Sequence, residues 1–197
     1  MMVKNLNKFK DLLVYTIENS QDKNGVYETK LWKLLYFCDA DFFEKHERTI
    51  TGADYIKNHF GPTPEIATIK EAVAALKLKG VVIRKNIKNR IGSNSYVYVR
   101  GDSPYSFDAL SGEELEDARK TLKKYGFLSV AQLTKLSHSD SPFLAAEPKK
   151  TIEFRNVLYR QDDIEIDTSE PINGREARQL ISDDSMAKLL EYATEKA

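Results

Sequence analysis

The chain has 197 residues, of which 41% are hydrophobic, and its 30 Lys and Arg balance 30 Asp and Glu. This length suits one domain with a full core, or one domain and a small extension. The formal net charge of zero gives no argument for a nucleic-acid or membrane partner. The charge is uneven, however, because residues 1–100 hold 17 basic against 11 acidic residues and residues 101–197 hold 13 against 19.

The single cysteine, Cys38, excludes an internal disulfide and is expected to be a small buried hydrophobic residue. No apolar run reaches the length of a membrane span, and the first residues lack the apolar core of a signal peptide. We therefore expect a soluble, cytoplasmic protein.

The segment 29–48 is predicted to be a long helix at the centre of the fold. It contains no helix breaker, and its apolar side chains spread well beyond one helical face. Lys33, Asp39 and Asp41 interrupt this apolar surface, which leaves two interpretations. Either Lys33 extends to solvent and the aspartates point to solvent or cap a neighbouring loop, or Asp39 accepts a buried hydrogen bond that holds the following loop.

Four further elements are predicted before residue 101. An amphipathic helix covers 5–19, and one brief strand is expected within 51–60. Thr63 and Pro64 are predicted to cap and begin a helix that stops at Gly80. The β-rich runs 81–87 and 95–100 then form a hairpin.

The remainder of the chain is predicted to be mostly helical. Two capping boxes, Ser111 with Glu114 and Ser129 with Gln132, open two helices. Residues 151–159 suit a strand or a helix, 161–170 form an acidic connector, and weak helices follow at 174–181 and 184–195.

Together these elements predict a mainly α fold with one β-hairpin (α+β). We expect a helical domain around a central buried helix, with an element order like that of a winged helix. The predicted organisation is a domain of residues 1–150 and a C-terminal extension of residues 151–197.

The sequence shows no motif for catalysis or for a cofactor. His46, His59 and His138 lack metal-ligand spacing, and no zinc-protease, Walker or nucleophile-elbow pattern is present. We therefore predict no catalytic, cofactor-binding or metal-binding residues, and a protein that is not an enzyme.

The predicted hairpin is the strongest electrostatic feature, since residues 72–100 contain no acidic residue. Its positive charge allows three roles: contact with a nucleic-acid backbone, contact with an acidic protein, or protection of an exposed strand edge. The candidate partner-binding residues of the hairpin are Arg84, Lys85, Lys88 and Arg90.

Three segments in this order, KLWKLLYFCDADFF, NHFGPTPEI and LTKLSHSDSPFLAA, resemble the Panacea (SocA-like) antitoxin domain. The similarity covers about residues 5–150. Departures occur at Cys38, Phe60, Ser137 and Phe143, where the family more often has alanine, an aromatic hydroxyl, threonine and tryptophan. The residues that match the family pattern, with a scaffold or partner-binding role, are Lys33, Tyr36, Asp39, Gly61, Pro62, Pro64, His138 and Pro142.

The resemblance implies an antitoxin from a prokaryotic or phage toxin–antitoxin pair, which neutralises its toxin by direct protein–protein binding. Family members pair with unrelated toxins, including small alarmone-synthetase-like toxins, and a related member is a protease adaptor that delivers its toxin for degradation. A basic toxin site could be blocked through charge complementarity by Asp162, Asp163, Glu165 and Asp167. The alternatives are a protease adaptor and a winged-helix nucleic-acid-binding regulator.

Overall fold

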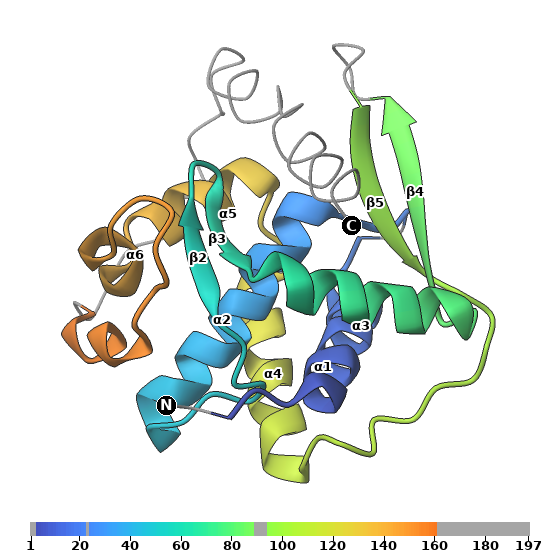
Figure 1. Cartoon of the computed structure of the whole chain (residues 1–197), viewed down its shortest axis with the longest axis horizontal. Helices are drawn as coiled ribbons and strands as arrows, with labels where there is room; N and C mark the ends of the chain where they lie inside the picture. Colours follow the sequence, from blue (N-terminus) through green and yellow to red (C-terminus); the bar gives the residue numbers. More distant parts are fainter. Residues whose placement is uncertain (1–2, 23, 89–93, 161–197) are drawn as a thin grey trace.

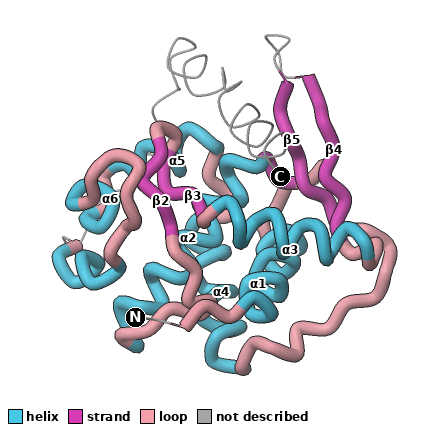
Figure 2. The backbone as a smooth tube through the Cα atoms, viewed as in Figure 1, coloured by secondary structure: helices cyan, strands magenta, loops and turns pink. Residues whose placement is uncertain are grey.

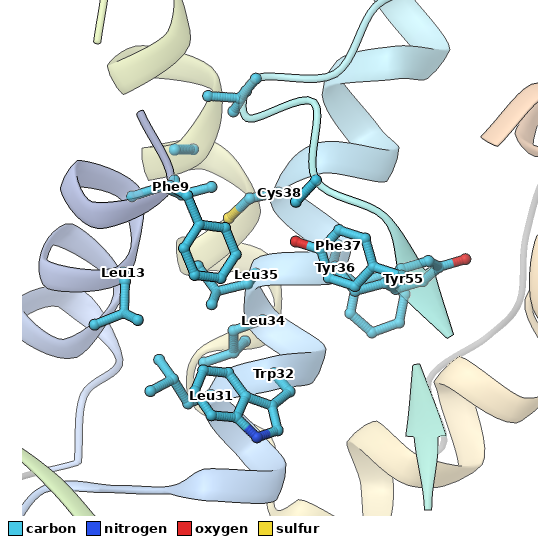
Figure 3. Close-up of a cluster of buried hydrophobic side chains, with 14 of the residues drawn as sticks. Phe9, Leu13, Leu31, Trp32, Leu34, Leu35, Tyr36, Phe37, Cys38 and Tyr55 are labelled. Atoms are coloured by element: carbon cyan, nitrogen blue, oxygen red, sulfur yellow. The ribbon is translucent and has the colours of Figure 1, made fainter. Parts of the chain in front are cut away.

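The structure, a computed structural model, describes residues 3–22, 24–88 and 94–160. Helix α2 (Glu28–His46) runs through the middle of the fold, and 14 of its 19 residues are buried (Figure 1). Both the helix and its central position were predicted. Helix α1 (Leu6–Asn19) packs against it, and Figure 3 shows Phe9 of α1 beside Leu35 and Cys38 of α2.

Two of the other helices begin at the predicted capping boxes, whereas the cap of α1 was not predicted. The side chain of Asn5 caps α1, and the Ser111–Glu114 capping box opens α4 (Gly112–Tyr125). The Ser129–Gln132 capping box likewise opens α5 (Val130–His138). Helices α4 and α5 both contact α2, so three helices surround the central one.

The predicted hairpin is present and belongs to a larger sheet. Strands β4 (Val82–Lys88) and β5 (Asn94–Arg100) are antiparallel (Figure 2), and β1 (Val26–Tyr27) pairs with the other edge of β5. The resulting order is β1-β5-β4. Strand β1 was not predicted, because two residues are too short to show an alternating pattern.

The predicted helix start at Thr63 and Pro64 is wrong. Residues Gly61–Pro64 form strand β3, which is antiparallel to β2 (Tyr55–Asn58), the brief strand expected within 51–60. Helix α3 (Ile66–Leu78) begins after Glu65, whose N–H bonds to the carbonyl of Asp54. Proline restricts the preceding residue to extended conformations, so the two prolines favour the strand here.

The described chain ends in two short elements, α6 (Ser141–Ala145) and the 3₁₀ helix η1 (Phe154–Tyr159). The segment 151–159 combines both predicted conformations, since Thr151 forms a bridge with Ile56 before η1 begins. Phe154 stacks on Tyr36 with ring centroids 5.7 Å apart, so η1 packs onto the core.

The acidic connector and the predicted helices at 174–181 and 184–195 lie outside the described residues. The division at residue 150 therefore stays a prediction. Within the described residues the fold is a mixture of helices with a three-stranded and a two-stranded sheet, in line with the predicted α+β class. In this part of the chain, no helix combines the length and apolar character needed to cross a membrane.

Candidate functional site

The residues that match the Panacea pattern gather around the middle of α2. Lys33, Tyr36 and Asp39 all lie on this helix and are almost fully buried. Strand β3, with its buried glycine and prolines, contacts α2, and so does α5, which ends at His138. The structure thus brings together motif residues that are far apart in the sequence.

Asp39 holds the loop that follows α2. Its Oδ1 accepts a hydrogen bond from the Thr51 N–H at 2.8 Å, and its Oδ2 accepts one from the Tyr55 hydroxyl at 2.9 Å. The Thr51 hydroxyl is a third donor to Oδ2. Of the two interpretations for Asp39, the structure confirms the buried hydrogen bond.

Burial is also the dominant influence on the ionisation of Asp39. Loss of solvent raises the pKa of this carboxyl to about 6, although the bonds from Thr51 and Tyr55 act in the opposite direction. The same carboxylate therefore anchors the turn before β2 and carries a desolvation cost near neutral pH.

Tyr36 belongs to a second buried network, which joins α2 to the last described residue. Its hydroxyl donates to Asp140 Oδ2 at 2.7 Å. The guanidinium of Arg160 donates to both oxygens of Asp140, at 2.7 and 2.9 Å, and to Asp41 Oδ1 at 2.8 Å. Burial and the neighbouring Asp140 raise the pKa of Tyr36 well above its ordinary value, so this phenol remains a hydrogen-bond donor.

Sequence reasoning missed three members of this network. Asp140 lies inside a motif segment but was not singled out, and Asp41 was expected to face solvent or to cap a loop. Arg160 had no local signal, because its partners precede it by 20 to 119 residues. The four groups form a connection between α2, the start of α6 and the end of η1.

Lys33 and Gly61 pack directly against each other. Gly61 has φ +111°, and a Cβ added there would lie 2.8 Å from Lys33 Cε and 3.0 Å from Ser137 Oγ. The Lys33 ammonium donates to the carbonyl of Thr29 at 3.2 Å and does not extend to solvent, which corrects the first interpretation. The glycine of the motif is therefore required by both its backbone conformation and its close neighbours.

His138 completes the cluster as a neutral ring. It stacks on Phe143 with ring centroids 4.7 Å apart, and its buried Nε2 has no hydrogen-bond partner among the described residues. Burial, followed by the positive charges of Lys33, His59 and Lys57, lowers the pKa of His138 to about 4. Pro142 is buried in the first turn of α6, next to Phe143.

The chemistry of these residues is structural. The carboxylates of Asp39 and Asp140 are occupied by donors from the protein itself, and each ties α2 to a later segment. Residues 3–22, 24–88 and 94–160 contain no group of three His, Cys, Asp or Glu side chains that could hold a metal ion. These hydrogen bonds and ring contacts of the motif residues therefore lie within the chain and support its fold.

The candidate residues of the hairpin differ in their surroundings. Arg84 is bound to Glu28 at 3.0 Å and lies 3.3 Å from the centre of the Tyr96 ring, so it is not a free surface cation. Lys85 and Lys88 are exposed and form no ion pair with any described residue. The remaining candidates lie outside the described residues: Arg90, Asp162, Asp163, Glu165 and Asp167.

A protein-family model described as "Antitoxin SocA-like, Panacea domain" matches residues 31–142. The chain belongs to this family. The match begins in α2 and ends in α6, so it contains every residue of the predicted family motif, while α1 and Arg160 lie outside it. No curated protein and no solved structure matches the chain.

Residues beyond the matched range contact the buried residues of the matched domain. Arg160 supplies the counter-charge for Asp41 and Asp140, and Phe154 stacks on Tyr36 and Phe43. The segment from the end of α6 to Arg160 completes the core that the family motif begins.

Proposed function

We propose that this protein is an antitoxin that neutralises a cognate toxin in the cytoplasm by direct protein–protein binding. The observation that carries the proposal is the antitoxin-like Panacea domain over residues 31–142. The proposed partner is a toxin protein, and a small alarmone-synthetase-like toxin is one candidate class. The role is non-enzymatic and requires no cofactor.

The burial of the motif residues indicates which part of the surface is available for a toxin. Tyr36, Asp39 and Asp140 are buried and bonded to other parts of the chain, so they maintain the fold and do not face a partner. A toxin has to contact exposed side chains, and the most prominent exposed element is the β4–β5 hairpin, which projects beyond the helices (Figure 1).

The test is co-expression with the product of the neighbouring open reading frame. We expect this chain to restore growth and to elute with that product as one complex in size-exclusion chromatography. A chain with Asp39→Ala serves as a control. The substitution removes the anchor of the 47–54 loop, so the control shows whether rescue requires an intact Panacea domain. Growth restored without any complex would contradict direct binding.

The same experiment separates neutralisation from degradation. In a host that lacks its ATP-dependent cytoplasmic proteases, a direct-binding antitoxin still restores growth. A protease adaptor does not, because the toxin then accumulates. Rescue that depends on a protease would replace our proposal by the adaptor alternative.

The acidic residues beyond the described part of the chain provide a further test of the partner. Asp162, Asp163, Glu165 and Asp167 would oppose a basic surface on the toxin, which speeds and orients association. Neutralising all four should weaken toxin binding and reduce its dependence on salt. Unchanged affinity would remove this segment from the interface.

A nucleic-acid-binding regulator with a winged-helix arrangement is the second candidate. Lysines at the end of α3 and on β4 form no ion pair with any described residue and favour this candidate, since they could contact phosphates. Most of the exposed positions along α3, including Ala67, Glu71 and Ala74, lack the donors that read base edges. Lys77 in its last turn is the exposed donor among them. Binding of the operon's promoter duplex that is lost in a Lys85→Gln/Lys88→Gln chain would support this candidate.

A further inference from the structure

Strand β4 has one edge without a strand partner in the described part of the chain. It is the outer strand of the order β1-β5-β4, and its seven residues pair one to one with β5 from Val82↔Arg100 to Lys88↔Asn94. The register is continuous, so no bulge bends this edge away, and the strand contains no proline. Figure 2 shows the hairpin projecting from the helices with β4 on its outer side. Such an edge is geometrically able to accept another strand.

The two faces of β4 have different surroundings. Arg84 points toward α2, where it bonds to Glu28 together with the hydroxyl of Tyr98. Side chains alternate along a strand, so Ile83, Lys85 and Ile87 share the opposite face. On that face Ile83 is 43% exposed, Lys85 is exposed and Ile87 is partly exposed. The free edge therefore presents an apolar–basic–apolar pattern away from the core.

Among the described residues, the charge at this edge is positive and mostly without ion-pair partners. Arg84 and Arg100 are compensated by Glu28 and Glu18. The lysines around the edge have no ion pair with any described residue: Lys77, Lys79, Lys85 and Lys88. A strand that pairs here meets the positive charge of these lysines.

This charge argues against pairing between two copies of the chain. Lys85 is the central residue of the seven in β4, so symmetric antiparallel pairing of two β4 strands would place Lys85 directly opposite its own copy. Like charges in directly opposed positions destabilise a sheet. The same lysine attracts a carboxylate on a different strand.

We propose that the free edge of β4 binds an extended segment of the partner as a fourth strand of the sheet. The partner segment alternates apolar and acidic residues, with a carboxylate near Lys85 and apolar side chains near Ile83 and Ile87. Main-chain hydrogen bonds supply the affinity of such strand addition, and the alternating side chains supply its specificity. In naming the toxin as the source of this segment, the inference rests on the proposed function.

Edge lysines also protect strands against indiscriminate pairing. Protection and recognition are compatible here, because the lysines reject neutral and basic strands and admit an acidic one. An edge that serves protection alone would still attract an acidic peptide but would have no partner strand in the complex with the toxin. The two roles therefore predict different results for residues 82–88 in that complex.

The first experiment uses the full chain and a synthetic peptide of alternating isoleucine and glutamate. We expect the peptide to bind and to slow amide hydrogen exchange within residues 82–88. A peptide with lysine in place of glutamate should not bind. Equal binding of both peptides, or unchanged exchange at 82–88, would overturn the proposal.

Charge reversal on the chain provides the matched control. The Lys85→Glu/Lys88→Glu chain should bind the acidic peptide about tenfold more weakly or worse. The Lys123→Glu/Lys150→Glu chain has the same change in net charge at exposed positions on α4 and before η1, and it should bind like the original. Equal weakening by both pairs would reduce the effect to overall charge and overturn the assigned edge.

The second experiment repeats these measurements with the co-expressed product of the neighbouring open reading frame. Protection of residues 82–88 in that complex, and loss of rescue in the Lys85→Glu/Lys88→Glu chain, would support the proposal. Full rescue by this chain with no protection at 82–88 would overturn the surface and leave the antitoxin function standing. If the peptide binds at β4 but the neighbouring product is not toxic, the binding surface would stand and the antitoxin function would be overturned.

The same data also test whether a segment of the chain itself pairs with the free edge of β4. The chain itself has an alternating acidic and apolar stretch, Asp163–Asp167. If residues 82–88 are already protected in the free chain, and replacing Asp163, Glu165 and Asp167 by neutral residues removes that protection, the chain occupies its own edge. That result would overturn the assignment of the edge to the toxin.

Discussion

Arg160 binds Asp140 at two points, with Nε 2.7 Å from Oδ1 and Nη2 2.9 Å from Oδ2. Asp140 belongs to the matched Panacea range, and Arg160 lies beyond it. The guanidinium also reaches Asp41 on α2, so two carboxylates inside the family domain share a counter-charge from outside it. The stability of the domain should therefore depend on this arginine.

Replacing Arg160 by methionine tests this dependence. The change keeps most of the side-chain volume and leaves Asp41 and Asp140 without their counter-charge, which should cost about 3 kcal/mol in the free energy of unfolding. Urea unfolding of the full chain measures it. Arg155→Met, at an exposed position of η1, is the matched control and should have little effect. Equal stability of the two variants would contradict the role of the Arg160 network.

Asp39→Ala removes the acceptor for three donors in the buried loop after α2. The Thr51 N–H and the hydroxyls of Thr51 and Tyr55 would lose their partner, and we expect a loss of about 3 kcal/mol in the free energy of unfolding. Thermal or urea unfolding measures this loss. A cost below that of a typical surface substitution would show that the loop is held by other contacts.

Asp39→Asn removes the titrating charge and keeps one of the two acceptor oxygens. The folded-state pKa of Asp39, about 6, exceeds its ordinary value of 3.8, so this group contributes stability that is fully present below pH 4 and is lost as the pH rises through 6. Asparagine does not titrate, so the variant should lack this component of the pH dependence. Unfolding free energies measured between pH 4 and 7 decide it, and parallel pH profiles of the two chains would refute the assignment.

Gly61→Ala should destabilise the contact between β3 and the centre of α2. The backbone of residue 61 has φ +111°, and the new Cβ would lie 2.8 Å from Lys33 Cε, so we expect a cost of about 2 kcal/mol. The matched control is Gly112→Ala at the start of α4, where no atom apart from the chain neighbours and the adjacent helix backbone lies within 4 Å of an added Cβ. That substitution should be neutral or slightly stabilising. Similar melting temperatures for the two variants would contradict this account.

His138→Phe should change the response of the protein to acid. The pKa of His138 is lowered to about 4 from its ordinary 6.5, so its contribution to stability is complete above pH 6.5 and is lost as the pH falls through 4. Phenylalanine keeps the stacking on Phe143 and removes the titration. The variant should lose less stability than the original between pH 6.5 and 4, as measured by urea unfolding at each pH. An equally steep loss would assign the acid sensitivity to other groups.

The sequence by itself determined the elements whose causes are local. The burial of α2 follows from the apolar residues on all sides of the segment 29–48, and α4 and α5 begin at Ser111 and Ser129 because each cap is formed within four residues. The hairpin follows from two alternating runs. The ordered motif segments around Tyr36, Gly61 and His138 were also sufficient to indicate the Panacea family, which the family match confirms.

Only the tertiary structure decided how these elements are connected. Strand β1 forms because it pairs with the edge of β5, and Gly61–Pro64 is a strand because it pairs with β2. The Asp140–Arg160 pair and the hydrogen bond from Tyr36 to Asp140 join residues 20 and 104 positions apart. Contacts over such separations depend on chain packing that no local pattern encodes. For the same reason, the sequence marked Arg84 and Lys85 equally as basic, and only the structure shows that Glu28 neutralises the first and leaves the second exposed at the free edge.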